Sequence, residues 1–159
     1  MPRSKCESAS DFSIFNMEQW TTHSARETIK RAAKIGKSLK PGMVVALKGN
    51  LGAGKTTFVK GLALGLGVKS EREVKSPTFV ILHIYKGRLP LYHFDLYRLD
   101  GPSDLDALGM EDFLGDPQAV SVIEWPERIP EILEQSDLNV ELIRNQDETR
   151  IIKVSKRKK

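Results

Sequence analysis

The chain of 159 residues has the length of one domain, and its 40% hydrophobic and 29% charged residues are ordinary globular usage, which excludes a chain disordered throughout. Its one cysteine, Cys6, excludes an intrachain disulfide and a cysteine zinc site. Five of the 25 basic residues lie in the last seven positions, and without them the net charge of +4 becomes −1, so no basic nucleic-acid face is expected over the body of the protein.

The first 20 residues show no periodicity and are predicted to form an N-terminal extension, with at most a short edge strand at Phe12, Ile14 and Phe15. They lack the apolar core of a signal peptide. No apolar run in the chain approaches the roughly 18–20 residues of a membrane span. We therefore expect a cytoplasmic protein with no membrane partner.

The capping-box pattern Ser24-Ala-Arg-Glu27 and the apolar spacing that follows it predict a helix from Ser24 to about Leu39. The continuous apolar run over 43–47 is typical of a strand that is covered on both faces. A glycine-rich turn follows, and residues 55–66 are predicted to form the next helix.

The second half of the chain predicts further strands. Residues 78–85 and 89–97 form a predicted hairpin, followed by a helix over 103–114 with Ser103 as N-cap and a buried strand over 119–124. A closing hairpin is predicted over 138–144 and 149–154. The sequence thus predicts an α/β fold, a three-layer P-loop NTPase-like domain with a mixed parallel and antiparallel sheet, over residues 21–152. Residues 153–159 are predicted to be a basic tail.

Residues 49–56, Gly-Asn-Leu-Gly-Ala-Gly-Lys-Thr, fit the P-loop pattern G-x-x-x-x-G-K-[ST] between a predicted strand and a predicted helix. Glycines let consecutive backbone N–H groups surround an anion, and the helix N-terminus adds roughly half a positive charge. Lys55 is predicted to reach the β- and γ-phosphates, and Thr56 to bind Mg²⁺. The alternative is a glycine-rich turn with a solvated lysine.

A P-loop works with an acidic residue at the end of a neighbouring strand, and the sequence offers Asp95 and Glu124. One is predicted to bind Mg²⁺ and the other to polarise the attacking water or sense the γ-phosphate. A structural salt bridge is the alternative for either one. In the sequence Ser76-Pro77-Thr78, Thr78 resembles a switch threonine, which bonds a γ-phosphate or its metal. The alternative is that Thr78 simply begins a strand. His83 and His93 are interpreted as packing residues, and Trp125 as apolar cover or part of the pocket wall.

Four motifs, in this order, resemble the TsaE family. They are Leu-Gly-Ala-Gly-Lys-Thr-Thr at 51–57, Ser-Pro-Thr at 76–78, His-Phe-Asp-Leu-Tyr-Arg at 93–98 and Ile-Glu-Trp-Pro at 123–126. The resemblance extends from about Ser24 to Arg150. Members of this family are bacterial P-loop ATPases required for the threonylcarbamoyl modification of the adenosine beside the tRNA anticodon. The resemblance therefore implies an ATPase that uses ATP and Mg²⁺ and is slow in isolation.

The resemblance also implies roles for individual residues. Thr56 and Glu124 hold Mg²⁺, Lys55 holds the phosphates, Asp95 is needed for hydrolysis, and Thr78 belongs to a switch-like segment. Ser24 and Thr28 border the adenine, although Ser24 is also the predicted N-cap. The implied nucleotide-binding loop consists of Gly49, Asn50, Leu51, Gly52, Ala53, Gly54, Lys55, Thr56 and Thr57. Asn50 departs from the aspartate usual in the family, and we expect a modest change in turnover or affinity.

The implied partner is the threonylcarbamoyl-transferase heterodimer, on which the protein docks with ATP and which hydrolysis resets. Two other function classes stay open. A small-molecule or nucleotide kinase would use the same loop, but Arg72 and Arg88 are the only arginines between positions 57 and 89, few for a cationic lid. An RNA-binding module would contact tRNA phosphates through residues 153–159, which otherwise stay solvated. A GTPase is disfavoured because the chain has no N-K-x-D sequence.

Overall fold

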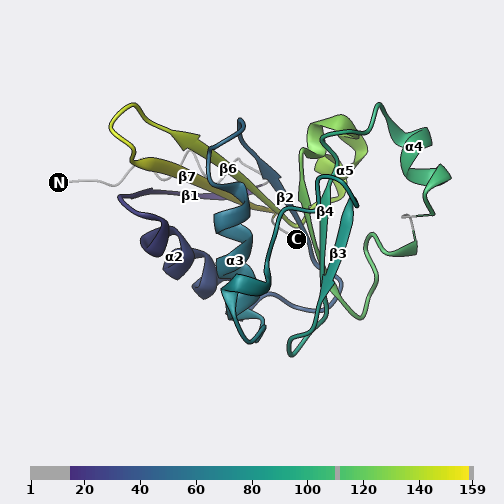
Figure 1. Cartoon of the computed structure of the whole chain (residues 1–159), viewed down its shortest axis with the longest axis horizontal. Helices are drawn as coiled ribbons and strands as arrows, with labels where there is room; N and C mark the ends of the chain where they lie inside the picture. Colours follow the sequence, from purple (N-terminus) through teal and green to yellow (C-terminus); the bar gives the residue numbers. More distant parts are fainter. Residues whose placement is uncertain (1–14, 110–111, 158–159) are drawn as a thin grey trace.

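The computed structural model describes residues 15–109 and 112–157, and seven strands form one mixed sheet in the order β1-β7-β6-β2-β5-β4-β3 (Figure 1). The strands are β1 (Phe15–Thr22), β2 (Val44–Lys48), β3 (Leu82–Tyr85), β4 (Leu91–Asp95), β5 (Val120–Glu124), β6 (Leu138–Arg144) and β7 (Arg150–Arg157). The helices are α2 (Ala25–Ser38), α3 (Lys55–Gly65), α4 (Pro102–Ala107) and α5 (Pro130–Gln135), with 3₁₀ turns at Glu71–Glu73 and Pro126–Arg128.

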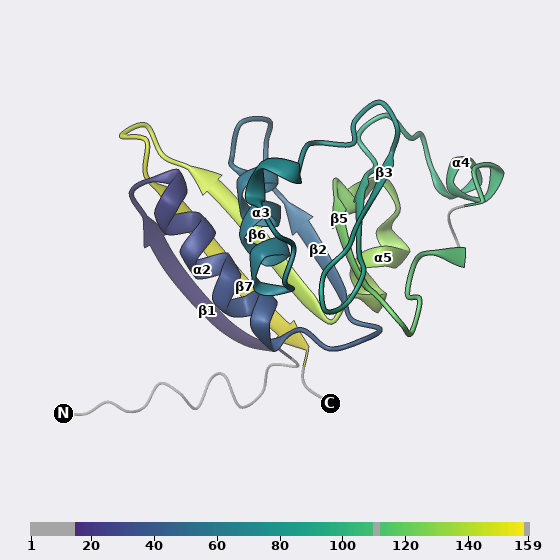
Figure 2. The ribbon, with the colours of Figure 1, turned by 60° about the horizontal axis from the view of Figure 1, so that its bottom comes forward.

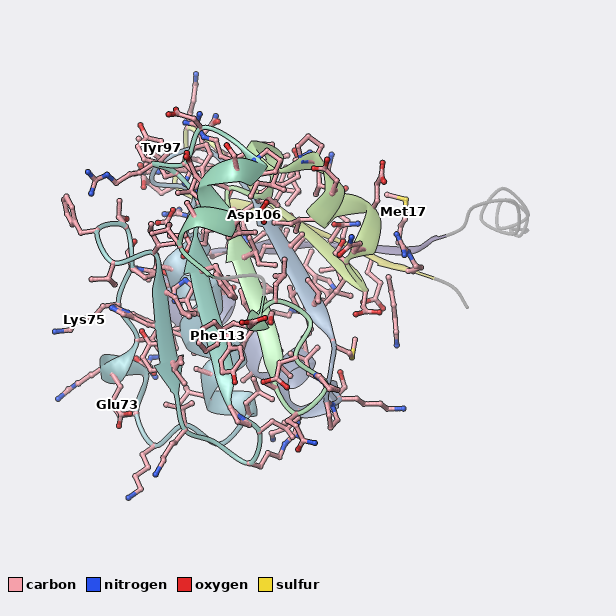
Figure 3. The ribbon with its side chains drawn as sticks, turned by 90° about the vertical axis from the view of Figure 1, so that its right-hand side faces the viewer. Met17, Glu73, Lys75, Tyr97, Asp106 and Phe113 are labelled. Atoms are coloured by element: carbon pink, nitrogen blue, oxygen red, sulfur yellow. The ribbon has the colours of Figure 1, made fainter. Side chains whose placement is uncertain are left out.

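Successive residues of the central strands point to opposite faces of the sheet and build two separate hydrophobic clusters. On β2, Val45 and Leu47 pack with α2 and α3, whereas Val44 packs in the cluster that contains α4 and α5. On β5, Val122 and Ile123 divide in the same way. Figure 2 shows α2 and α3 over β1, β7, β6 and β2. Phe113 packs edge-on against Tyr92 of β4, with 5.4 Å between ring centroids, on the other face (Figure 3). The predicted three-layer α/β fold is confirmed.

The centre of the sheet is parallel and its margins are antiparallel. β2 pairs in parallel with β5 and with β6, and β4 pairs in parallel with β5. The carboxyl ends of β2, β5 and β4 therefore meet at one edge of the sheet, which is where ligands bind in open α/β sheets. The two predicted hairpins, β3–β4 and β6–β7, are antiparallel, as expected.

The predicted cap of the first helix is confirmed. Ser24 has extended backbone angles and its side chain accepts a hydrogen bond from the Glu27 backbone N–H at 3.1 Å. The Glu27 carboxylate accepts from the backbone N–H of His23, one position before the predicted N-cap. Both interactions satisfy free N–H groups at the start of α2.

Helices α2 and α3 pack with their backbones close together because glycines lie at the crossing. A Cβ atom on Gly65 would lie 2.3 Å from the Ala33 carbonyl oxygen, and one on Gly36 would lie 2.4 Å from the Leu62 carbonyl oxygen. No side chain fits in either position, so the helix pair depends on these glycines.

The structure differs from the predicted terminal segments in the part that it describes. Residues 15–20 belong to β1 and residues 153–157 to β7, and the two strands pair antiparallel over eight residues. The basic composition of the C-terminal segment hid its alternation, in which Ile152 and Val154 are buried while Lys153 and Ser155 occupy the opposite face. The Phe12 and Ile14 part of the predicted edge strand lies outside the described residues.

The predicted helix over 103–114 has the wrong bounds. α4 spans only Pro102–Ala107, and its N-cap is Gly101 in place of Ser103. Proline is favoured at the first helical position, where its missing N–H costs nothing and its φ angle suits a helix. Gly109, with φ of 69°, follows the end of the helix. Within residues 15–109 and 112–157, no helix has both the length and the apolar character that crossing a bilayer requires.

Candidate nucleotide-binding site

The glycine-rich loop joins the end of β2 to the start of α3 at the carboxyl edge of the sheet. Gly54 immediately precedes α3 with φ of 105°, a conformation that side chains other than glycine rarely adopt. A Cβ atom at this position would also lie 3.2 Å from Nε of Arg150. The loop therefore needs glycine here both for its backbone conformation and for the space that the guanidinium occupies.

Lys55 begins α3 and is almost fully buried. Its Nζ donates hydrogen bonds to the backbone carbonyls of Gly49 and of Asn50, the latter at 3.2 Å, and lies 4.2 Å from the centre of the Trp125 ring. Burial lowers the pKa of the Lys55 ammonium, while nearby carboxylates, Glu124 foremost, act in the opposite direction. The ammonium is thus held at the loop by carbonyl oxygens, which are weaker partners than phosphate oxygens.

The two predicted carboxylates lie side by side. Asp95 and Glu124 end the neighbouring parallel strands β4 and β5 and are paired in register, and Glu124 is also paired in register with Leu47 of β2. Adjacent strands are about 4.8 Å apart. Each carboxylate residue is only 3% exposed. The arrangement agrees with the sequence prediction that carboxylates from two strands lie beside the loop.

Both oxygens of Asp95 accept hydrogen bonds. Oδ2 accepts from the hydroxyls of Thr78, at 2.9 Å, and Ser76, at 3.2 Å. Oδ1 accepts from the backbone N–H of Tyr97 at 2.9 Å. The segment that carries Thr78 is therefore tied to the carboxylate end of β4, as a switch-like segment beside this acid would be.

Glu124 contacts both Thr56, in the first turn of α3, and the buried His93. Its Oε2 accepts a hydrogen bond from the Thr56 hydroxyl at 3.4 Å and lies 2.6 Å from Nε2 of His93. His93 is fully buried, and its Nδ1 makes no hydrogen bond within the described residues. The interpretation of His93 as a packing residue missed this contact, because the sequence alone does not reveal that the register partner of His93 is Val122, two residues before Glu124.

A pocket of 370 Å³ opens where these groups meet. It is lined by Leu51, Gly52, Gly54, Lys55, Thr56, Thr57, Ser76, Thr78, Asp95, Tyr97, Glu124, Trp125 and Arg150. Gly49 and Asn50 take part through the carbonyls that hold Lys55, and Ala53 is buried beneath the loop. Trp125 lines the pocket, and its αL backbone, with φ of 59°, turns the chain just after Glu124.

Ser24 and Thr28 are not among the lining residues of this pocket. Ser24 is engaged as N-cap of α2, and Thr28 is buried with its hydroxyl 2.7 Å from that of Thr22. Both side chains have structural partners at the start of α2. Their place beside an adenine stays a prediction.

Arg150 is a pocket residue that the sequence did not indicate. It begins β7, opposite Arg144 in the β6–β7 register, and one of its guanidinium nitrogens, Nη1, donates to the Glu148 carbonyl at 2.8 Å. Arg144 pairs with the Glu148 carboxylate, whereas Arg150 has no carboxylate partner among residues 15–109 and 112–157. Arg150 lies far from the loop in sequence, so no local pattern places it there.

The donor set suits a hard divalent cation such as Mg²⁺. The Thr56 hydroxyl and the Glu124 carboxylate offer oxygen ligands beside a loop built for phosphate, and Mg²⁺ prefers one or two carboxylates together with substrate phosphate oxygens. No cluster of three or more His, Cys, Asp or Glu residues suited to a metal occurs in the part of the chain that the structure describes. The Thr56 hydroxyl and the Glu124 carboxylate are thus the described residues that could hold such a cation.

Comparisons with known proteins show to which family the chain belongs. The sequence profile of the family "Threonylcarbamoyl adenosine biosynthesis protein TsaE" matches residues 22–152. A tRNA threonylcarbamoyladenosine biosynthesis protein TsaE from Treponema pallidum is 44% identical over 121 residues, which cover 76% of this chain and 87% of the relative. The protein of the same name from Bacillus subtilis is 43% identical over 135 residues, or 84% of this chain and 82% of the relative.

A solved structure is also similar. The crystal structure of Bacillus subtilis YdiB superposes with a TM-score of 0.69 at 34% sequence identity, covering 91% of this chain and 88% of that one. Fold, motif order and sequence identity agree over the same region of the chain. The chain belongs to the TsaE family, which functions in the biosynthesis of threonylcarbamoyladenosine in tRNA.

Proposed function

We propose that this protein is a Mg²⁺-dependent ATPase that acts in the cytoplasm, slow in isolation, which docks with ATP on the threonylcarbamoyl-transferase heterodimer and resets that complex by hydrolysis. The observation that carries the proposal is the placement of two in-register carboxylates, Asp95 and Glu124, beside a P-loop whose lysine is buried. This is the set of groups that phosphoryl transfer requires.

In this proposal the loop backbone and Lys55 bind the β- and γ-phosphates. Lys55 exchanges its bonds to the Gly49 and Asn50 carbonyls for stronger, charge-assisted bonds to phosphate oxygens. Arg150 adds a second cation over the loop, next to Gly54. The N-terminus of α3 points its free N–H groups at the same phosphates.

Thr56 and Glu124 would hold Mg²⁺, which neutralises charge on the β- and γ-phosphate oxygens when bound. Asp95 orients the attacking water and draws on its proton while the water oxygen bonds to the γ-phosphorus and the bond to the β–γ bridging oxygen breaks. For this Asp95 must free an oxygen from Thr78 or Ser76, which both donate to Oδ2. The engaged carboxylate gives a physical reason for slow hydrolysis by the protein alone.

Docking on a partner is supported by apolar side chains beside the site. Phe79 is 84% exposed, and Val80 and Ile84 are more than half exposed, directly after Thr78 and on β3. Exposed apolar side chains grouped beside an active site are typical of an interaction surface. A partner that covers Phe79 would also move the segment that holds Asp95, which couples docking to hydrolysis.

The nucleotide assignment is tested by isothermal titration of the full chain with ATP and Mg²⁺. Lys55→Ala should lose measurable binding, and ATP binding equal to that of the unaltered protein would defeat the assignment. The docking proposal is tested by adding the partner heterodimer and unmodified tRNA: it should change the hydrolysis rate, and Phe79→Ser should remove that change while leaving ATP binding intact. Steady transfer of labelled γ-phosphate to a small acceptor would support a kinase in place of this proposal.

A further inference from the structure

The basic and acidic residues are distributed unevenly among three parts of the sequence, which the overall net charge does not show. Residues 24–40 contain six basic residues and one acidic residue, and residues 153–159 contain five basic residues and no acidic one. The remaining 135 residues carry 14 basic and 20 acidic residues, a net charge of −6. The near-neutral net charge of the body conceals this division, since residues 24–40, which contain α2, carry a net charge of +5.

The fold directs this charge to one exposed side of α2. Lys30, Lys34 and Lys37 follow one another at four and three residues, which puts them on one helix face along about 10 Å of the axis. All three are exposed, while the opposite face of the helix, with Ala32 and Gly36, is buried against α3.

A groove of 570 Å³ runs along this face beside β1. Four cations line it, Lys30, Arg31, Lys34 and Lys37, with Glu27 as the single carboxylate. Glu27 is turned toward His23, whose backbone N–H it accepts at 3.0 Å. Its negative charge is therefore engaged at one end of the groove.

None of the four cations forms an ion pair among the residues that the structure describes. The ion pairs among residues 15–109 and 112–157 are His23–Glu27, His93–Glu124 and Arg144–Glu148, and none includes these four. Like charges three and four residues apart destabilise a helix. Arg31 is also held in place, with its guanidinium carbon 5.2 Å from the centre of the Trp20 ring. A row of exposed cations without ion-pair partners creates a positive potential that attracts a polyanion.

One basic residue of β7, Lys156, lies on the same side of the sheet as α2. β1 runs antiparallel to β7, and α2 follows β1 after two residues and lies back along it (Figure 2), so α2 and β7 end at the same end of the molecule. Side chains alternate between the two faces of a strand, so Lys156 points to the same face of β7 as Ile152 and Val154. Those two side chains pack in the cluster under α2 and α3. Lys156 is thus brought to the side of the sheet that α2 covers, more than 110 residues away in the sequence, whereas Lys153 lies on the opposite face.

We propose that the groove formed by Lys30, Arg31, Lys34, Lys37 and Glu27, which we name the α2 groove, binds the phosphate backbone of RNA. A row of cations with no exposed apolar wedge fits a sugar-phosphate chain, whereas a helix that binds a membrane surface presents its apolar face outward, and that of α2 is buried. RNA is also the substrate class of the family's pathway. The α2 groove lies outside the nucleotide pocket and shares no lining residue with it.

The test measures binding of fluorescein-labelled, unmodified tRNA to the full chain by anisotropy, without nucleotide, at several KCl concentrations. The triple variant Lys30→Gln/Lys34→Gln/Lys37→Gln should weaken binding about 10-fold or more at 100 mM salt and lower the slope of log Kd against log salt by about two to three, since each lost phosphate contact contributes about 0.7–0.9. The control variant Lys69→Gln/Arg72→Gln/Lys86→Gln removes the same charge from exposed positions outside the α2 groove. It should change the affinity less than threefold.

The outcomes separate RNA from other anions. Equal losses in the two triple variants, or no loss in the first, would overturn the proposal. Binding to phosphatidylglycerol vesicles that the first variant alone abolishes, with tRNA binding unchanged, would assign the groove to membranes and would also overturn it. Both variants should retain ATP binding and the same circular dichroism spectrum, so failure of the nucleotide proposal is detected separately. The first variant should melt at the same or a higher temperature, because it relieves repulsion along α2.

Discussion

His93 and Glu124 meet inside the protein, with 2.6 Å between Nε2 and Oε2, directly behind the proposed cation site. The contact joins β4 to β5 below the pocket, and Oε2 also accepts from Thr56. One carboxylate oxygen is thus held by the protein, and the orientation of the other is set with it. His93 acts as a positioning residue for a carboxylate that would bind Mg²⁺.

Replacement of His93 should therefore lower the affinity for Mg²⁺ more than it lowers the affinity for the nucleotide. We expect His93→Leu to lower the affinity for Mg²⁺ by about 10–100-fold, the usual cost of losing a partner of a metal ligand. His93→Gln, which can keep a donor toward Glu124, should lose less. In a Trp20→Phe background Trp125 is the only tryptophan, so its emission reports Mg²⁺ titrations in the presence of ATP. An unchanged Mg²⁺ midpoint in a folded His93→Leu variant would contradict the positioning role.

Substitution of Glu124 and substitution of Asp95 should have different effects on ATP binding and hydrolysis. Glu124→Gln should raise the Mg²⁺ concentration needed for ATP binding, because an amide is a weaker ligand than a carboxylate. Asp95→Asn should leave ATP binding within about threefold while lowering the hydrolysis rate by about 10²–10⁴, the typical contribution of general acid–base catalysis. Binding by titration calorimetry and hydrolysis by phosphate release, measured on the same samples, check the two expectations. Equal losses of ATP binding and of hydrolysis in both variants would show that Glu124 and Asp95 do not have these separate roles.

Arg150 should contribute to nucleotide affinity while Arg144 should not. The two residues are paired in register, but only Arg150 lines the pocket, and Arg144 is paired with Glu148. Arg150→Met should weaken ATP binding by about 1–3 kcal/mol, the range for a hydrogen bond to a charged group. Arg144→Met is the matched control on the adjacent strand and should weaken ATP binding clearly less than Arg150→Met does, because its guanidinium is paired with Glu148 and does not line the pocket. A larger effect of Arg144→Met would refute this assignment.

The contact between α2 and α3 should tolerate no side chain at Gly65. A Cβ atom there would lie 2.3 Å from a backbone oxygen, so Gly65→Ala must move a helix and should cost about 1–3 kcal/mol of unfolding free energy. Gly101→Ala is the control, because nothing lies within 4 Å of its Cβ position and its φ of 171° is extended backbone. Urea unfolding followed by circular dichroism measures both. Equal stability of Gly65→Ala and the unaltered chain would mean that the helices can separate without cost.

Much of the site could be predicted because its parts are local. The P-loop is eight consecutive residues between a strand and a helix, and both carboxylates follow apolar strands directly. Since parallel strands end at the same edge of a sheet, Asp95 and Glu124 were expected together, and their register places them side by side. The cap of α2 was equally local, because Ser24 and Glu27 contact within one helical turn.

The partners of these groups could not be predicted, since they lie far away in the sequence. His93 reaches Glu124 only through the pairing of β4 with β5, and Arg150 reaches Gly54 only because β7 follows β6, which lies beside β2. The bounds of α4 were missed for a different reason, the preference of Pro102 for the first helical position, which a reading centred on Ser103 overlooked.

The amino-acid sequence by itself determined the glycine-rich loop that we propose binds phosphate, the acids that end two strands and the alternation of strands and helices, because each depends on neighbours along the chain. Only the tertiary structure decided which distant side chain completes each group, and it placed the cations of α2 along one exposed groove of a protein whose net charge does not reveal them. Strand pairing and helix packing bring such residues together, and the hydrophobic periodicity of the sequence does not show which distant residues come into contact.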